Sequence, residues 1–147
     1  MDRGRRGTKR HQIVDRNGLP LATVLSGANV PDGKRLLATV DAIAPVRGKR
    51  GRPRRRPVKV HADKAYDDKT LRQGLRERGI VPRLSRRGIE SSQKLGRYRW
   101  VVERTFSWQQ GAKRLRIRDE RRDDIYAAFV AIENAMICWG RLNDHFC

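Results

Sequence analysis

Residues 58–68 read VKVHADKAYDD, and this stretch decides the fold class. Small apolar residues at positions 58, 60 and 62 alternate with Lys59, His61 and Asp63, which is the period of a β-strand with one buried face. Asp63 then stands at the carboxyl end of the strand, where ligands and reacting groups collect in open α/β sheets. We interpret His61 as a surface residue rather than a metal ligand. The stretch predicts an α/β fold with a candidate site at the end of this strand.

Outward from this strand, the sequence predicts alternating strands and helices. Two strand-like runs, 8–14 and 19–25, are joined by Asp15-Arg16-Asn17-Gly18, and Asn-Gly between such runs is a strong hairpin signal. The resulting order, ββαβαβαα, indicates an α/β layer fold with a partly parallel sheet. The predicted helices cover about 31–45, 68–79, 95–115 and 123–139, with a short strand at 80–84 before the third.

Apolar side chains on the last two helices are expected to form core. Trp100, Val102 and Phe106 suggest that the third helix packs on the sheet through this face. Trp108 and the stripe from Ile125 to Trp139 are likewise interpreted as core rather than as platforms for base stacking.

Charge is the most informative part of the composition. The chain has 35 Lys and Arg against 16 Asp and Glu, a formal net charge of +19 over 147 residues. Such a charge favours a polyanion through the release of condensed counterions, so nucleic acid is the first partner to consider and an acidic membrane surface a weaker one. No apolar run approaches the roughly 20 residues that span a bilayer, and we expect one cytoplasmic domain over 1–147 without a membrane. The two cysteines lack the spacing of a zinc site or a disulfide framework.

The segment 47–57, RGKRGRPRRRP, is a basic loop punctuated by Pro and Gly. Arg50, Arg52, Arg54 and Arg55 are its candidate DNA contacts. Arg50-Gly51-Arg52-Pro53 resembles the AT-hook, which lays arginines in the narrow minor groove of A·T-rich DNA. The alternative is a loop that contacts phosphates without regard to sequence. Both interpretations predict contact with DNA.

Glu103 is the second acid of interest. On a helix its neighbours one turn away are Arg99, Phe106 and Ser107, and we expect it to point along the packing edge toward the end of the Asp63 strand. Two carboxylates at one end of a sheet would form an oxygen-ligand site for Mg²⁺ beside a phosphate-binding surface. Taken alone, each residue has a simpler interpretation: Asp63 as a turn or cap residue, and Glu103 as a solvated helix partner of Arg99.

Three segments together resemble the catalytic domain of bacterial insertion-sequence transposases of the DDE class. They read GTKRHQIVDRNGLPLATVLSGANVPD, VRGKRGRPRRRPVKVHADKAYDD and LGRYRWVVERTFSW, and they follow one another over nearly the whole chain. The resemblance implies an RNase H-like fold with two Asp and one Glu that bind two Mg²⁺ or Mn²⁺ ions. It makes Asp63 the second acid and Glu103 the third, with Arg99 as the basic residue four positions earlier. Arg99, Lys64, Lys113 and Arg114 are then further candidate DNA contacts.

The chain departs from that family at the first acid, which lies on a strand before the hairpin. Asp2 has no strand pattern around it, and Asp15 is better explained as a turn residue. We therefore expect an N-terminally truncated domain that lacks a central strand, so that two unpaired strand edges face each other.

The expected function is metal-dependent DNA cleavage and strand transfer on transposon ends and target DNA. The chain would act near the bacterial nucleoid, with a homo-oligomer as a possible form. The alternatives are a non-catalytic DNA-binding fragment or inhibitor of a full-length transposase, and a chain whose missing part comes from another reading frame.

Overall fold

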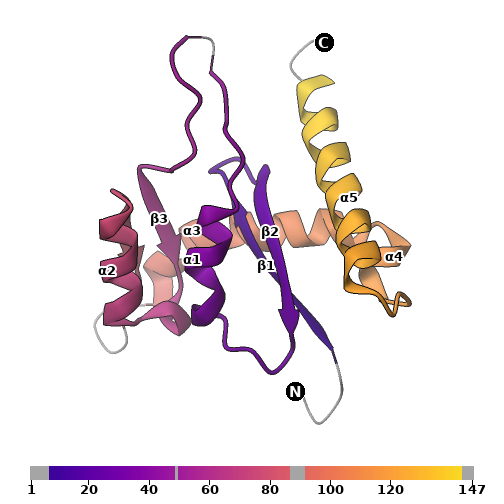
Figure 1. Cartoon of the computed structure of the whole chain (residues 1–147), viewed down its shortest axis with the longest axis horizontal. Coiled ribbons are helices and arrows are strands. Elements are labelled where there is room, and N and C mark those ends of the chain that lie inside the picture. Colours follow the sequence, from indigo (N-terminus) through magenta and orange to yellow (C-terminus); the bar gives the residue numbers. More distant parts are fainter. Residues whose placement is uncertain (1–6, 49, 87–91, 144–147) are drawn as a thin grey trace.

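The structure is a computed structural model that describes residues 7–48, 50–86 and 92–143, without the side chains of 92–99 and 143. The elements follow the order that the sequence predicts, and the structure adds a 3₁₀ helix (η1) and a four-residue helix (α4). They are β1 Thr8–Val14, β2 Pro20–Gly27, α1 Gly33–Asp41, β3 Lys59–Ala62, η1 Lys64–Tyr66, α2 Lys69–Glu77, β4 Val81–Leu84, α3 Ser92–Gln110, α4 Lys113–Arg116 and α5 Asp123–Asn143. In Figure 1, α2 and β3 lie on one side of the hairpin and α5 on the other, while α3 crosses behind.

The hairpin β1–β2 forms where the sequence predicts it. The Oδ1 atom of Asp15 accepts hydrogen bonds from the backbone N–H groups of Asn17 and Leu19, both at 2.8 Å. Gly18 has a φ of +84°, in the left-handed region that glycine adopts without steric cost. Asp15 is therefore a turn residue, as its sequence context indicates.

Helix α3 holds the tip of this hairpin. Thr105, which is fully buried, donates its hydroxyl hydrogen bond to the carbonyl oxygen of Gly18 at 2.7 Å. Arg104 donates to the carbonyl oxygen of Asn17 at 2.6 Å. A Cβ atom on Gly18 would lie 3.1 Å from the Thr105 hydroxyl, so glycine also permits the close approach of the turn to the helix. These contacts fix the position of α3 along β1 and β2.

The strands form two sheets of two strands rather than one mixed sheet. Among the described residues, β1 pairs only with β2, antiparallel, and β3 only with β4, parallel. The parallel pair with α2 between its strands confirms the predicted α/β class. The partly parallel sheet expected from sequence is divided into two pairs, and no described strand lies between them to exchange backbone hydrogen bonds with both. Ile13 of β1 nevertheless packs against the core cluster that contains Val60 of β3, so the two sheets share a core.

Helix α2 begins and ends where its sequence predicts. Asp68 is the N-cap, and its carboxylate accepts hydrogen bonds from the backbone of Thr70 at 2.6 Å and Leu71 at 3.4 Å. Gly79 follows the helix with a φ of +72°, a conformation common after a helix C-terminus. The loop 78–80 then leads directly into β4.

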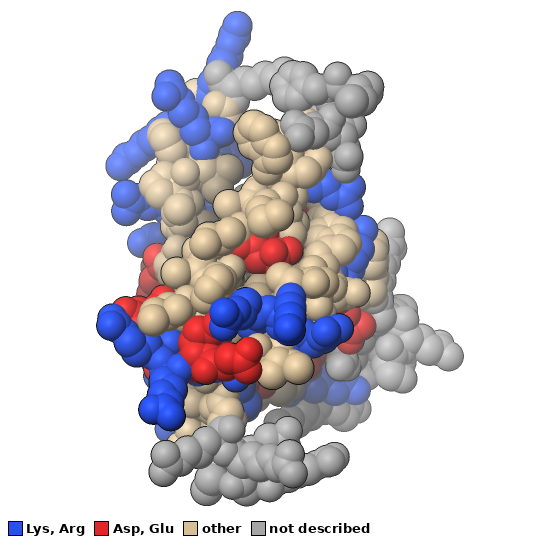
Figure 2. All heavy atoms as spheres, turned by 90° about the vertical axis from the view of Figure 1, so that its right-hand side faces the viewer, with Lys and Arg blue, Asp and Glu red and all other residues tan. Residues whose placement is uncertain are grey.

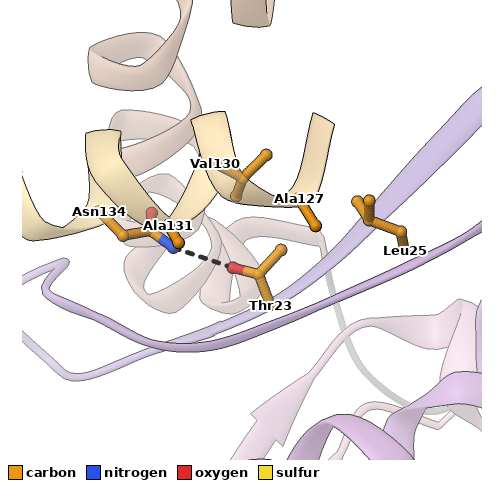
Figure 3. A pocket seen from close by; sticks show the side chains of 6 residues that line it. All are labelled: Thr23, Leu25, Ala127, Val130, Ala131 and Asn134. Atoms are coloured by element: carbon orange, nitrogen blue, oxygen red, sulfur yellow. Dashed lines mark hydrogen bonds between the residues drawn. The ribbon is translucent and has the colours of Figure 1, made fainter. Parts of the chain in front are cut away.

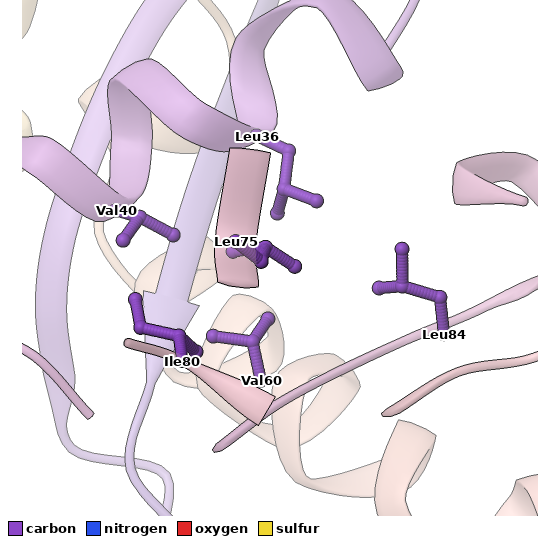
Figure 4. Close-up of a cluster of buried hydrophobic side chains, with 6 residues drawn as sticks. All are labelled: Leu36, Val40, Val60, Leu75, Ile80 and Leu84. Atoms are coloured by element: carbon purple, nitrogen blue, oxygen red, sulfur yellow. The ribbon is translucent and has the colours of Figure 1, made fainter. Parts of the chain in front are cut away.

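The main core lies between α1, α2 and the β3–β4 pair (Figure 4). Leu75 of α2 is completely buried at its centre. Helices α1 and α2 approach closely because Gly74 has no side chain: a Cβ atom there would lie 2.7 Å from Leu37. The buried members of the cluster are Leu36, Val40, Val60, Leu75, Ile80 and Leu84.

Buried polar side chains connect α5 to the rest of the fold. Gln109 of α3 is fully buried and donates a hydrogen bond to the Oδ1 atom of Asn134 at 2.6 Å. Asn134 in turn donates to Thr23 of β2 at 3.2 Å, and Arg10 of β1 donates to the Oε1 atom of Gln109 at 3.3 Å. Since buried polar groups are costly unless they are hydrogen-bonded, this network specifies how α5 sits on β2 and α3.

Most of the apolar stripe of α5 does not form core, contrary to the expectation from sequence, although Phe129 packs on a small second cluster. Tyr126 and Val130 are the buried residues of this helix in that cluster, whereas Ile132 is 57% and Trp139 67% exposed. The helix is apolar on two opposite sides. It packs on the fold through the side with Tyr126 and Val130, and the side with Ile132 and Trp139 is exposed. Over Asp123–Leu142 it is also long and apolar enough to cross a membrane by length and composition alone.

His11 makes the stability of the fold sensitive to acid. Its ring is buried, with Nε2 2.7 Å from the Ser26 hydroxyl and Nδ1 3.9 Å from Asp32. Burial lowers the pKa of His11 below 6.5; Asp32 opposes this effect, and Lys9 and Arg35 add to it. Because the folded state prefers the neutral ring, its stability is fully present above pH 6.5 and falls as the pH drops below that value.

Denaturant unfolding of the chain between about pH 7.5 and pH 5 measures this loss. The variant His11→Gln should lose less stability over the range than the parent chain. Partial desolvation and the charges of Lys59 and Arg83 also lower the pKa of His61, so His61→Gln should remove a separate part of the loss, and the double variant should lose less stability than either single one. An equal pH dependence in His11→Gln and the parent would contradict the assignment.

Candidate functional site

Asp63 stands at the carboxyl end of β3, as predicted. Val60 is buried and His61 exposed, which confirms the alternation along the strand. Asp63 itself is half-buried and caps η1, where its Oδ1 atom accepts a hydrogen bond from the backbone of Ala65 at 2.9 Å. The capping role considered from sequence is therefore real, and one carboxylate oxygen is engaged in it.

Asp32 is an acid near Tyr66 that the sequence interpretation did not include in the site. Both carboxylates lie close enough to the Tyr66 phenol to affect it: burial and then the charges of Asp32 and Asp63 raise the pKa of Tyr66 to about 12. Asp32 also pairs with Lys9 at 3.2 Å. Asp32 stands at the N-cap position of α1, and its proximity to Tyr66 arises from tertiary packing rather than from any spacing along the chain.

The ionisation of Tyr66 tests this arrangement. We expect one of the three tyrosines to remain neutral well above pH 10 and to titrate near pH 12. Removing either neighbouring charge, by Asp32→Asn or Asp63→Asn, should lower the pKa of Tyr66, because a nearby anion disfavours the phenolate. Ultraviolet difference spectra or ring-carbon NMR of the folded protein would follow it. Asp41→Asn is the control, and a Tyr66 pKa equally insensitive to all three would contradict the proximity.

Glu103 lies on a different face of α3 from the one predicted. The buried residues of this helix are Val101, Thr105 and Gln109, one turn apart. Glu103 is two residues from both Val101 and Thr105, about 200° around the helix, and it is exposed. The face with Trp100 and Phe106 was the wrong packing face, because the buried stripe contains polar residues that pair with the hairpin and with α5.

The described acids do not assemble a metal centre by themselves. Within residues 7–48, 50–86 and 92–143, no three His, Cys, Asp or Glu side chains form a group that could hold an ion. Helix α3 packs mainly against β1, α4 and α5 rather than against the β3–β4 pair that carries Asp63. The residues present thus do not fit a two-ion Mg²⁺ or Mn²⁺ site without a further ligand.

The basic loop lies at the opposite end of β3 from Asp63. It forms an extended arm, closed at its base by a backbone bridge between Val46 and Arg54 with hydrogen bonds of 2.8 and 2.9 Å (Figure 1). Because the loop leads into the strand, it projects from the amino end, whereas Asp63 follows the carboxyl end. The four arginines predicted to contact DNA are exposed along it: Arg50, Arg52, Arg54 and Arg55.

The remaining predicted DNA contacts are scattered. Lys64 is half-buried next to Asp63 on η1, and Lys113 is exposed on α4. Arg114 pairs with Glu120 at 2.8 Å and covers the ring of Phe129, so part of its donor capacity is already used. Arg99 lies on α3, but its side chain falls outside the description.

Stacked basic and aromatic side chains form a strip that the sequence did not reveal. The guanidinium of Arg104 lies over Trp100 at 4.4 Å and over Trp108 at 4.9 Å from the ring centroids. Arg141 of α5 covers the ring of Trp108 at 5.0 Å. The spacing of four residues from Trp100 through Arg104 to Trp108 is the pattern that could have indicated this strip.

A small pocket of about 140 Å³ lies between β2 and α5 (Figure 3). Asn134 and Thr23 meet at its edge in the hydrogen bond drawn there. Its other lining residues are Leu25, Ala127, Val130 and Ala131. None of these side chains can ionise, and neither Asp63 nor Glu103 lines the pocket, so it is not part of the candidate acidic site.

Comparison with known proteins gives the family. The sequence matches the transposase DDE domain over residues 2–139. A Burkholderia cepacia protein described as "Putative transposase for insertion sequence element IS402" is 51% identical over 141 residues, which cover 96% of this chain and 67% of that protein. No solved structure matches the sequence. The resemblance drawn from the three sequence segments is confirmed, and the chain belongs to the transposase DDE domain family.

Proposed function

We propose that this chain is the part of an RNase H-like transposase catalytic domain that carries the second and third acids, Asp63 and Glu103. The domain would perform metal-dependent cleavage and strand transfer of double-stranded DNA in the bacterial cytoplasm. The observation that carries the proposal is the position of Asp63, half-buried at the carboxyl end of a strand parallel to its neighbour. Family membership and the net charge of +19 support DNA as the substrate.

A further strand with its own acid would complete the site. The β1–β2 and β3–β4 pairs share a core through Ile13 and Val60 but exchange no strand hydrogen bonds. A strand between them would pair with both and would bring a third carboxylate near Asp63. Three carboxylates would supply the oxygen ligands that Mg²⁺ or Mn²⁺ prefers, which Asp63 and Glu103 alone do not.

The second candidate is a DNA-binding fragment without catalysis. The observation that favours it is the lack of a three-ligand group among the described acids. Such a fragment would occupy transposon DNA through its basic loop and compete with a complete transposase.

The experiment is nicking of supercoiled DNA with Mg²⁺ or Mn²⁺, for two proteins. One is this chain alone, and the other is a chimera in which the chain replaces the matching two thirds of the Burkholderia cepacia relative. We expect DNA binding without nicking from the first, and nicking from the second that Asp63→Asn or Glu103→Gln abolishes. Asp41→Asn, an exposed acid paired with Arg78, is the control and should leave nicking intact.

Each alternative outcome has a definite meaning. Nicking by the chain alone, lost in both acid variants, would show that no further ligand is needed. A folded chimera that binds DNA but does not nick it would favour the non-catalytic fragment. Nicking that survives Asp63→Asn would refute the assignment of the acids.

A further inference from the structure

The exposed face of α5 repeats like one side of a coiled coil. Ile125, Ile132 and Trp139 are seven residues apart, and Ala128, Ala135 and Leu142 follow each of them by three. This is the a and d spacing of a heptad repeat, which marks a narrow apolar seam between two helices. We call these six residues the α5 seam. They are exposed, with the four large side chains between 42% and 67% accessible.

Nothing else in the described chain covers this seam. The helix packs on β2, α3 and α4 through its opposite side, where Tyr126 and Val130 are buried. In the view that faces α5, uncharged side chains cover much of the middle of the surface, with one acidic group among them, Lys and Arg above and at the sides, and groups of both charges below (Figure 2). An exposed apolar stripe of this length is typical of an interaction surface.

We propose that the α5 seam is a dimer interface in which α5 of one chain packs antiparallel on α5 of a second copy. The argument is the order of large and small side chains. In an antiparallel pair, a positions face d positions, so Ile125 meets Leu142, Ala128 meets Trp139, and Ile132 meets Ala135. Each of the four central layers then combines one large and one alanine side chain, which gives even packing without voids or overlap.

A parallel pair would pack poorly. Trp139 would then face Trp139, while Ala128 and Ala135 would each face themselves and leave gaps. The antiparallel pair also brings the acidic first turn of one helix, with Asp123 and Asp124, to the same end as Arg141 of the other. This arrangement has two-fold symmetry, so it closes with two copies and predicts a dimer rather than a filament.

The test is the mass of the chain in solution, by analytical ultracentrifugation over a range of concentrations. Salt of about 0.5 M would reduce the Debye length to roughly 4 Å and so screen the repulsion between two highly basic chains. We expect a dimer for the parent chain and a monomer for Ile132→Glu and for Ala135→Lys. Ile117→Glu, at a residue 58% exposed outside the seam, is the control and should remain dimeric.

The double variant Ile132→Glu/Ala135→Lys decides the orientation. In the antiparallel pair each carboxylate faces an ammonium group, so dimerisation should recover relative to the single variants. In a parallel pair like charges would meet in both layers, and the double variant would dissociate more than either single one. Circular dichroism of every variant establishes that the fold is kept.

Three results would overturn the proposal. They are a parent chain that is monomeric at all concentrations, a dimer that Ile132→Glu and Ala135→Lys leave unchanged, and recovery that fails in the folded double variant. A monomer that instead floats with neutral phosphatidylcholine vesicles, and no longer does so after Ile132→Glu, would assign the seam to lipid.

Discussion

Replacing Leu75 with alanine is expected to lower the free energy of unfolding by about 2 to 5 kcal/mol. Leu75 is completely buried at the centre of the cluster that joins α1, α2, β3 and β4. Its truncation removes apolar contacts and leaves a cavity that the surrounding helices and strands can fill only in part. A domain of this size typically has 5 to 15 kcal/mol of stability in total, so the variant would lose a large share of it.

Urea unfolding at neutral pH measures this change. Val58→Ala is a matched control, because Val58 is 71% exposed and its truncation should change stability by less than about 0.5 kcal/mol. Equal effects of the two substitutions would mean that the α1–α2 cluster is not the core of the domain.

Removing the charges of Arg50, Arg52, Arg54 and Arg55 together, by substitution with alanine, is expected to weaken binding to duplex DNA severely. If each arginine contacts one phosphate, the slope of log K against log salt should fall by about 3 to 4. Fluorescence anisotropy with a labelled duplex at several salt concentrations measures both affinity and slope. A slope unchanged from that of the parent chain would show that the loop does not contact phosphates.

The same four positions changed to lysine separate the two interpretations of the loop. Lysine keeps the charge, so a loop that contacts phosphates should retain most of its affinity and salt slope. An AT-hook depends on arginine in the narrow minor groove, and its preference for A·T-rich duplexes should disappear. Comparing A·T-rich and G·C-rich duplexes of equal length gives the answer.

The secondary-structure elements bounded by characteristic turn and capping residues were predictable from sequence. Asn17-Gly18 fixes the hairpin, Asp68 and Gly79 bound α2, and the alternation around Val60 identifies β3. These features depend on residues within a few positions of one another, so a single sequence contains the information. The α/β class followed from their order.

The packing faces of helices α3 and α5 were not predictable in the same way. Helix α3 buries Thr105 and Gln109, whose side chains hydrogen-bond to Gly18 and Asn134 in distant segments of the chain. Helix α5 is apolar on two sides, and periodicity does not indicate which side meets the core. The expected packing face of α3 and the expected burial of most of the Ile125 to Trp139 stripe were wrong for these reasons.

The candidate site was predictable in its chemistry more than in its geometry. Asp63 lies where the strand pattern placed it, but Asp32, whose charge acts on the same Tyr66 phenol, is 31 positions away in sequence and approaches that phenol only through tertiary packing. The basic loop is adjacent to Asp63 in sequence and still projects from the other end of β3. Two segments that flank a strand in sequence lie at its opposite ends, so closeness in sequence does not bring the basic loop to Asp63.

The hydrogen bond that joins Gln12 to Asn134 spans 122 residues of sequence, and this has a consequence for synthesis in the cell. At about 5 to 20 residues per second, the ribosome needs roughly 6 to 24 s to deliver Asn134 after Gln12 has been made. The hairpin can form early, but the side of β2 that α5 covers stays exposed during that interval. A nascent chain with this order of elements offers an apolar surface to chaperones before its final helix is released.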